Sequence, residues 1–244
     1  MNRTSAWQRA FEVTSGQWGM ITRQQLANLG MSDKVIGRAT APGGIFARVA
    51  HGVYRLEGAP VVADEGLRAA WLQLAPNVLA SKRTVEQGVV SHRSAANLYF
   101  FGDLPADVYE FTVRPSKQSR RNDVRVYRKD LAPGGCGRKY GLLVTKPARI
   151  VADLLGDYPD LEAIGRIATD ALGAHQVTTD ELIETISPHA IRLGFRSGDG
   201  KALLRAMLQS VDAANIPANG TTLASGYAIP MAVFMDASKG AELK

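Results

Sequence analysis

Residues 19–56 read GMITRQQLANLGMSDKVIGRATAPGGIFARVAHGVYRL and contain the start and stop signals of two short helices. Thr22, followed by Gln25, matches a capping box, so we expect a helix to begin there. Gly30 suits the left-handed conformation that ends a helix, and Ser32 can cap the next helix, over about residues 33–40. Two capped helices separated by a tight turn predict a helix-turn-helix.

The flanking residues complete a winged helix. Upstream, the spacing of Trp7, Phe11 and Thr14 predicts a helix that ends near Gly16. Downstream, residues 45–49 and 53–56 are typical of two short strands around the turn at 50–52. A hairpin after the second capped helix is a wing. We therefore expect an α+β fold with a winged helix-turn-helix over residues 1–60.

This arrangement favours DNA binding, because the second capped helix of a helix-turn-helix enters the major groove. Lys34 and Arg38 are expected to point outward from it, and cations beside the wing tip are expected to meet phosphates. Short helical units with a hairpin also serve as protein-interaction modules, which is the alternative. The expected DNA-binding residues are Thr22, Arg23, Gln24, Ser32, Lys34, Arg38, Arg48, His51 and Arg55.

After a linker at Gly58 to Pro60, residues 61–217 predict a larger domain of mixed α and β structure with a helical C-terminal part. Strands are expected over residues 108–113 and 124–127, paired as a hairpin, and over 141–144. Helices are expected over about 64–74, 91–101, 145–155, 161–172, from 178 onward, and over 203–211. Residues 218–244 are expected to form a loosely ordered or docking tail.

Charge is unevenly distributed along the chain. The net charge is +6, yet residues 114–149 alone hold eleven basic and two acidic residues. The loop between the two expected strands contributes Arg114, Lys117, Arg120 and Arg121. Such a block indicates a polyanion or an acidic protein as partner, because a solvated face normally mixes both signs.

Composition and motifs exclude several classes of function. Cys136 is the only cysteine, so neither an intrachain disulfide nor a cysteine-based zinc cluster can form. Glu110 and Asp123 lack the nearby lysine of a metal-dependent nuclease, and no phosphate-binding glycine loop is present. His92 and Ser94 lie at an expected helix start and not on a strained nucleophile turn. We expect that the protein is not an enzyme and that it holds no cofactor or metal. Because the sequence has no apolar span and no signal peptide, we also expect a cytoplasmic protein.

The stretch quoted above, with its Gly52 to Arg55 ending, resembles the N-terminal domain of AbiEi-family antitoxins, as do GVVSHRSAANLYFFGDLP (88–105) and TKPARIVADLL (145–155). The resemblance implies a phage-defence toxin-antitoxin system. It implies that the winged helix recognises operator DNA and represses the operon. It also implies that the second domain neutralises a nucleotidyltransferase (AbiEii-like) toxin, with or without stable contact. In such a protein, the basic loop between the two expected strands is expected to bind either DNA or the toxin. The alternative is a stand-alone transcriptional regulator with a ligand-sensing or dimerisation domain.

Overall fold

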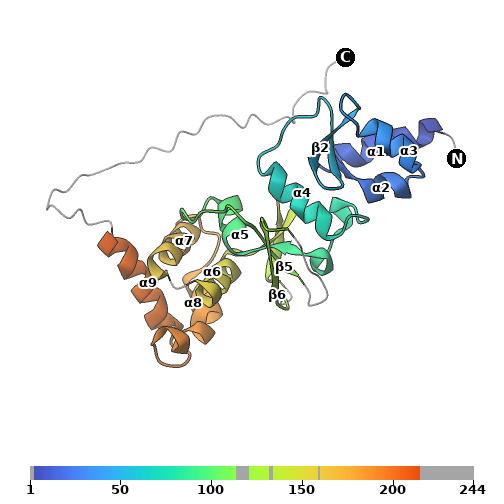
Figure 1. The fold of residues 1–244 in the computed structure, drawn as a ribbon. Helices are drawn as coiled ribbons and strands as arrows, with labels where there is room; N and C mark the ends of the chain where they lie inside the picture. The colour runs from blue at the N-terminus through green and yellow to red at the C-terminus, as the bar shows by residue number, and fades with distance from the viewer. Residues whose placement is uncertain (1–2, 114–120, 132–133, 159, 215–244) are drawn as a thin grey trace, which may run out of the picture.

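The computed structural model describes residues 3–113, 121–131, 134–158 and 160–214 (Figure 1). It is an α+β protein with two sheets, of three and five strands. The N-terminal sheet belongs to a winged helix-turn-helix, and the larger sheet belongs to a mixed part that ends in packed helices. The expected fold class is therefore confirmed. The expected tail at 218–244 lies outside the described residues.

The winged helix follows the expected order with one added strand. Its elements are α1 (Arg3–Ser15), β1 (Met20–Thr22), α2 (Arg23–Asn28), α3 (Asp33–Ala39), β2 (Phe46–Ala50) and β3 (Val53–Leu56). The strands pair antiparallel in the order β1-β3-β2. Thr22 and Gln25 form the expected capping box, whereas the Ser32 side chain makes no capping hydrogen bond to α3. β1 was not predicted, because its three residues are too few to show a period.

The larger part begins with α4 (Glu65–Leu74) and two short 3-10 helices, η1 (Ala80–Lys82) and η2 (Val85–Gln87). Its sheet has the order β6-β5-β4-β8-β7. The strands are β4 (Val89–Val90), β5 (Tyr109–Val113), β6 (Val124–Arg128), β7 (Cys136–Lys139) and β8 (Leu142–Thr145). The main helices are α5 (His92–Tyr99), α6 (Pro147–Asp157), α7 (Leu161–Gly173), α8 (Thr179–Ile186) and α9 (Gly200–Ala214), with η3 (Ser187–His189) and η4 (Ile191–Leu193) before α9.

The expected hairpin of residues 108–113 and 124–127 is wrong. β5 and β6 are neighbours, but they run parallel, with Tyr109 opposite Val124 and Val113 opposite Arg128. The antiparallel partner of β5 is β4, on its other side. The chain after β5 therefore returns to the start of that strand before β6 begins. The basic loop is a crossover connection and not a hairpin tip.

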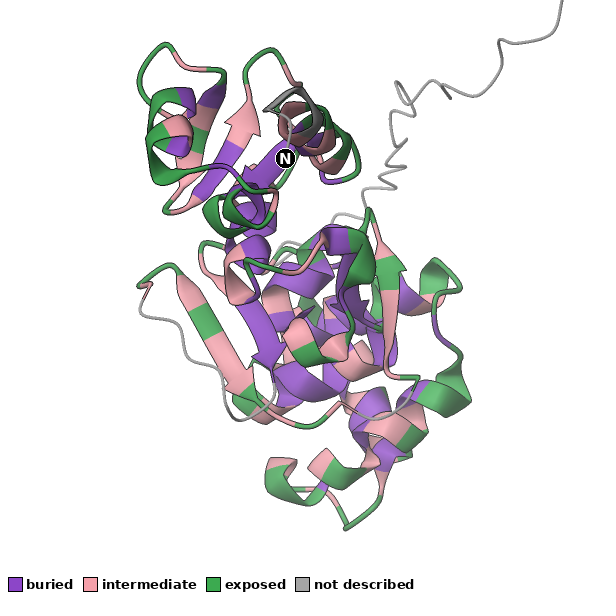
Figure 2. Cartoon of the chain, turned by 90° about the vertical axis from the view of Figure 1, so that its right-hand side faces the viewer, coloured by how far each residue is buried: buried purple, intermediate pink, exposed green. Residues whose placement is uncertain are grey.

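Two hydrophobic cores meet at α4. The smaller core lies inside the winged helix and includes Ile21, Leu26, Ile36 and Phe46. The larger core extends through α4, the five-stranded sheet and α6 to α9, and it also takes in Met20 and Val53 of the N-terminal sheet. Buried residues thus continue from the winged helix into the larger part (Figure 2), and α4 contacts β1, β2 and β3. This packing fixes the orientation of the winged helix.

Candidate nucleic-acid interface

Helix α3, the second helix of the helix-turn-helix, has one buried and one exposed face. Ile36 is fully buried and Ala39 nearly so, which anchors the helix to the small core. Ser32, Lys34 and Arg38 are exposed. Lys34 and Arg38 are four residues apart, so they share one side of the helix. No ion pair joins either cation to another of the residues that the structure describes. Both are available for an external anion.

The start of α2 lies beside the start of α3. Arg23 and Gln24 are exposed, and the Arg23 guanidinium donates to the Asp33 carboxylate over 2.7 Å. Arg23 remains 47% exposed in this pair. Because exposed ion pairs contribute little free energy, a DNA phosphate can compete for this guanidinium. The structure therefore brings Arg23 to the start of α3, whereas Gln24 is exposed on α2 and donates to Asn28.

At the wing, Arg48 and His51 are exposed and adjacent, with Arg48 Nη2 3.3 Å from His51 Nδ1. The wing tip is held from behind, because the Gln73 side chain on α4 donates to the His51 carbonyl over 2.7 Å. Gln73 Oε1 in turn accepts a hydrogen bond from Arg121. A braced wing loses less conformational entropy on binding than a free hairpin does.

Two of the expected DNA-binding residues face the protein interior. Thr22 is fully buried, and its hydroxyl donates to the Pro76 carbonyl while accepting the capping bond from Gln25. Arg55 forms an ion pair with Glu65 of α4 at 2.8 Å and donates to the Ala59 carbonyl. The larger part covers this side of the sheet, so these two side chains lack the exposure that a DNA contact requires. Neither side chain is placed to contact DNA.

Of the second basic group, the structure describes Arg121, whereas Arg114, Lys117 and Arg120 lie outside the described residues. Arg121 makes a bidentate ion pair with Asp123. Its Nη2 contacts Oδ2, and its Nε donates to Oδ1 over 2.8 Å. That hydrogen bond raises the pKa of Arg121 and lowers the pKa of Asp123. Through Gln73, Arg121 is connected to the wing tip, so the basic crossover connection ends beside the wing.

A buried amide network joins the winged helix to the larger part. The Gln17 side chain donates to Gln25 Oε1 over 2.9 Å and accepts from the Ala80 backbone over 3.0 Å. Gln25, on α2, donates to the Val78 carbonyl over 3.3 Å. Gln17 and Gln25 are 2% and 3% exposed, so these bonds are shielded from water. Residues 76–80 are therefore hydrogen-bonded to the start of α2 and to the segment that precedes it.

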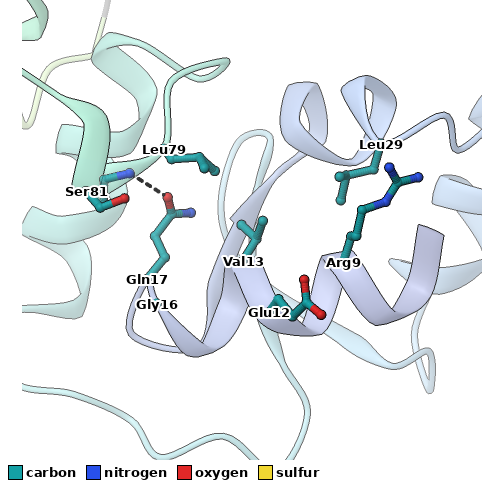
Figure 3. A pocket seen from close by; sticks show the side chains of 9 residues that line it. Arg9, Glu12, Val13, Gly16, Gln17, Leu29, Leu79 and Ser81 are labelled. Atoms are coloured by element: carbon teal, nitrogen blue, oxygen red, sulfur yellow. Dashed lines mark hydrogen bonds between the residues drawn. The ribbon is translucent and has the colours of Figure 1, made fainter. Parts of the chain in front are cut away.

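A pocket of about 310 Å³ opens beside this network (Figure 3). One wall comes from α1, the turn after it and the residue after α2, with Arg9, Glu12, Val13, Gly16, Gln17 and Leu29. The other wall comes from Leu79, Ala80 and Ser81. Its size lies at the lower end of the range for small-molecule sites. Its floor is mainly apolar, and the pocket spans both parts of the molecule.

A second polar cluster, centred on His92, lies inside the larger part. His92 is fully buried and stacks on Tyr127 with 3.5 Å between ring centroids. Its ring nitrogens lie 2.9 Å from Ser91 Oγ and 3.0 Å from Asp157 Oδ2. Burial, the largest influence, lowers the pKa of His92, and neighbouring carboxylates oppose this only in part. Ser91 is also fully buried, so this serine cannot meet a substrate in the described conformation.

Glu110 on β5 completes this cluster. Its carboxylate is fully buried and accepts from Tyr158 and Tyr127 hydroxyls over 2.7 and 2.9 Å and from the Arg93 backbone over 2.8 Å. Burial opposes ionisation, but the bonds from Arg93 and Tyr158 outweigh it and lower the pKa of Glu110. Every cation around it has a carboxylate partner. The cluster also joins edge strand β6 to α5 and α6. Its partners are distant in sequence, so no motif reveals it.

Comparison with known proteins adds little. No protein-family model matches the chain, and no curated protein matches it. Among solved structures, the chain is similar to the RV2827C protein from Mycobacterium tuberculosis, with 15% sequence identity and a TM-score of 0.44. That match covers 84% of this chain and 82% of the other. A likeness this weak carries no argument about fold or function.

Proposed function

We propose that this protein binds operator DNA through its winged helix and acts as repressor and antitoxin of a toxin-antitoxin operon. The observation that carries the DNA proposal is the pair Lys34 and Arg38, exposed on α3 and without an ion-pair partner among the described residues. In this proposal α3 enters the major groove, where both side chains reach base edges or phosphates. Arg48 and His51 contact the flanking backbone from the wing.

The basic crossover connection extends this footprint. Arg121 lies beside the wing tip through its bond to Gln73, and the same connection contains Arg114, Lys117 and Arg120. Phosphate contacts add affinity without reading sequence, and each one increases the salt dependence of binding. We therefore assign this group to DNA in preference to the toxin.

The antitoxin role is supported by the resemblance of residues 19–56, 88–105 and 145–155 to AbiEi-family antitoxins. This resemblance assigns the neutralisation of a nucleotidyltransferase toxin to the larger part. In this proposal the protein acts in the cytoplasm. None of the helices that the structure describes has the length and apolar character needed to cross a membrane.

The DNA proposal is tested by titrating fluorescent promoter DNA with the purified chain. We expect Lys34→Ala and Arg38→Ala each to weaken binding by about 5-fold to 100-fold, that is about 1–3 kcal/mol. A variant that loses a phosphate contact also lowers the slope of log affinity against log salt by about 1. Lys201→Ala, an exposed cation on α9, is the matched control and keeps wild-type affinity. Wild-type affinity in both α3 variants contradicts the assignment.

A stand-alone regulator is the second candidate, and the pocket beside Gln17 is the observation that favours it, since both parts of the molecule line that pocket. Expression of the neighbouring reading frame, with and without this protein, distinguishes the antitoxin from the stand-alone regulator. Growth arrest relieved by co-expression supports the antitoxin. A harmless neighbour, or toxicity that persists, leaves a DNA-binding regulator whose pocket takes a small effector.

A further inference from the structure

The wing is docked on the larger part through one of its own strands. β2 has a bulge between Arg48 and Ala50, where the register with β3 shifts. A bulge inserts an unpaired residue and redirects the side chains near it. Val49 and Ala50 pack against the larger core although they belong to the wing, whereas Arg48 and His51 stay exposed. The wing therefore has an apolar side toward the larger part and a polar side toward solvent.

Gln73 on α4 holds the wing tip on this apolar side. Its amide makes two hydrogen bonds: Nε2 donates to the His51 carbonyl over 2.7 Å, and Oε1 accepts from the Arg121 guanidinium. An amide can serve a carbonyl and a guanidinium at once, whereas a carboxylate only accepts and an ammonium only donates. Trp71 and Leu72, which precede Gln73, are fully buried in the larger core. The backbone from which Gln73 projects is therefore fixed.

Arg121 is anchored in turn by the five-stranded sheet. Its charge is balanced by the bidentate ion pair with Asp123, and its guanidinium lies 6.0 Å from the ring centroid of Tyr109. The Tyr109 backbone on β5 donates to the Asp123 carbonyl over 2.8 Å. Tyr109 also contacts α4 closely, since a Cβ placed on Gly66 would lie 1.9 Å from its hydroxyl oxygen. These contacts form a continuous chain from the larger sheet through Gln73 to the wing tip.

We propose that Gln73 is a positioning residue for operator binding, which holds the wing so that Arg48 and His51 meet the DNA backbone in one fixed place. The inference rests on the DNA binding proposed above and deepens it, because it gives the larger part a role in that binding. A wing that is held in advance does not have to be ordered on the DNA. The bond to His51 is exposed to solvent, so its loss has little effect on the stability of the whole fold.

Gln73→Met tests the proposal, because it removes the donor and the acceptor, keeps the length of the side chain and adds no charge. We expect affinity for promoter DNA to fall by about threefold to tenfold, and the slope of log affinity against log salt to fall by about 1. Hydrogen exchange should become faster in residues 46–56 and stay unchanged in α6. Gln209→Met, at an exposed position on α9, is the matched control and keeps wild-type values throughout.

A double-mutant cycle distinguishes positioning from a general effect on the chain. If Gln73 acts through the wing, its substitution should matter little once the residues that it positions are gone. In a chain that already contains Arg48→Ala and His51→Ala, we expect Gln73→Met to lower affinity further by less than about twofold. A further loss as large as in the wild-type background shows that Gln73 does not act through these two side chains.

The outcomes separate this inference from the function on which it rests. If the wild type binds promoter DNA and Gln73→Met binds it with the same affinity and salt slope, the positioning role is overturned while DNA binding stands. Additive losses in the cycle, or a melting temperature lowered by more than about 5 °C, assign Gln73 to the stability of the whole chain and also overturn the positioning role. A wild type that does not bind promoter DNA overturns both proposals.

Discussion

At the scale of single residues, burial makes His92 sensitive to pH. Burial lowers the pKa of this imidazole below its ordinary 6.5, so the folded protein binds the proton less readily than the unfolded chain does. The free energy of unfolding should therefore decrease as the pH falls below about 6.5. His92→Asn removes the titrating group at a left-handed position that asparagine tolerates, and should flatten this dependence.

Urea denaturation between about pH 7.5 and pH 5 measures the effect. We expect the variant to be less stable than the wild type at pH 7.5, because it loses the stacking on Tyr127 and the bond to Asp157, and to lose less stability on acidification. The exposed His175→Asn variant provides the reference slope. Equal pH slopes in the wild type and His92→Asn show that this histidine does not govern acid sensitivity.

Arg83 has a structural role at the same scale. It is 2% exposed, and its guanidinium donates to the carbonyls of Trp71, Leu72 and Ala75 at the end of α4. Burial lowers the pKa of Arg83 to about 9, so the group is still charged at neutral pH. A cation there satisfies carbonyls that a helix end leaves without partners and suits the negative end of the helix dipole.

Arg83→Met should therefore destabilise the protein by about 3 kcal/mol, since it leaves several buried carbonyls without donors. The shift of the urea midpoint at constant slope measures the loss. Lys82→Met, at the exposed neighbouring position, should change stability by less than about 0.5 kcal/mol. If the two substitutions have equal effects, water or other donors replace the guanidinium.

At the scale of elements, the sequence was informative where local chemistry decides the structure. The capping box at Thr22, the apolar spacing of α6 and α7, and the turn at 50–52 all predicted elements that the structure contains. β7 was missed because Cys136 to Lys139 shows no alternation of apolar and polar residues. The direction of β6 was not predictable either, because alternation looks the same in parallel and antiparallel strands.

The exposure of the candidate interface residues was predictable to a similar degree. Lys34 and Arg38 followed from helical spacing, because the period of α3 separates the buried Ile36 from its neighbours. The covering of Thr22 and Arg55 was not predictable, because it depends on Pro76 and Glu65, which belong to the other part of the molecule. A pattern within one domain contains no information about the surface that a second domain covers.

At the scale of the whole molecule, the shared core decides whether the two parts unfold together. Met20 is fully buried in the larger core although it belongs to the winged helix, and the bonds of Gln17 and Gln25 cross the same junction. We therefore expect a single cooperative unfolding transition. Hydrogen exchange measured by mass spectrometry across a urea series should give the same midpoint for peptides from α2–α3 and from α6–α7.

Met20→Ala tests the coupling most directly. Removing this buried side chain should cost about 2–5 kcal/mol and lower the midpoints of both sets of peptides equally. Ile36→Ala, in the small core alone, should do the same if the chain is one cooperative unit, because loss of the winged helix uncovers Met20 and Val53. If Ile36→Ala instead shifts only α2–α3, the winged helix unfolds independently. Operator binding would then be separable from whatever the larger part does.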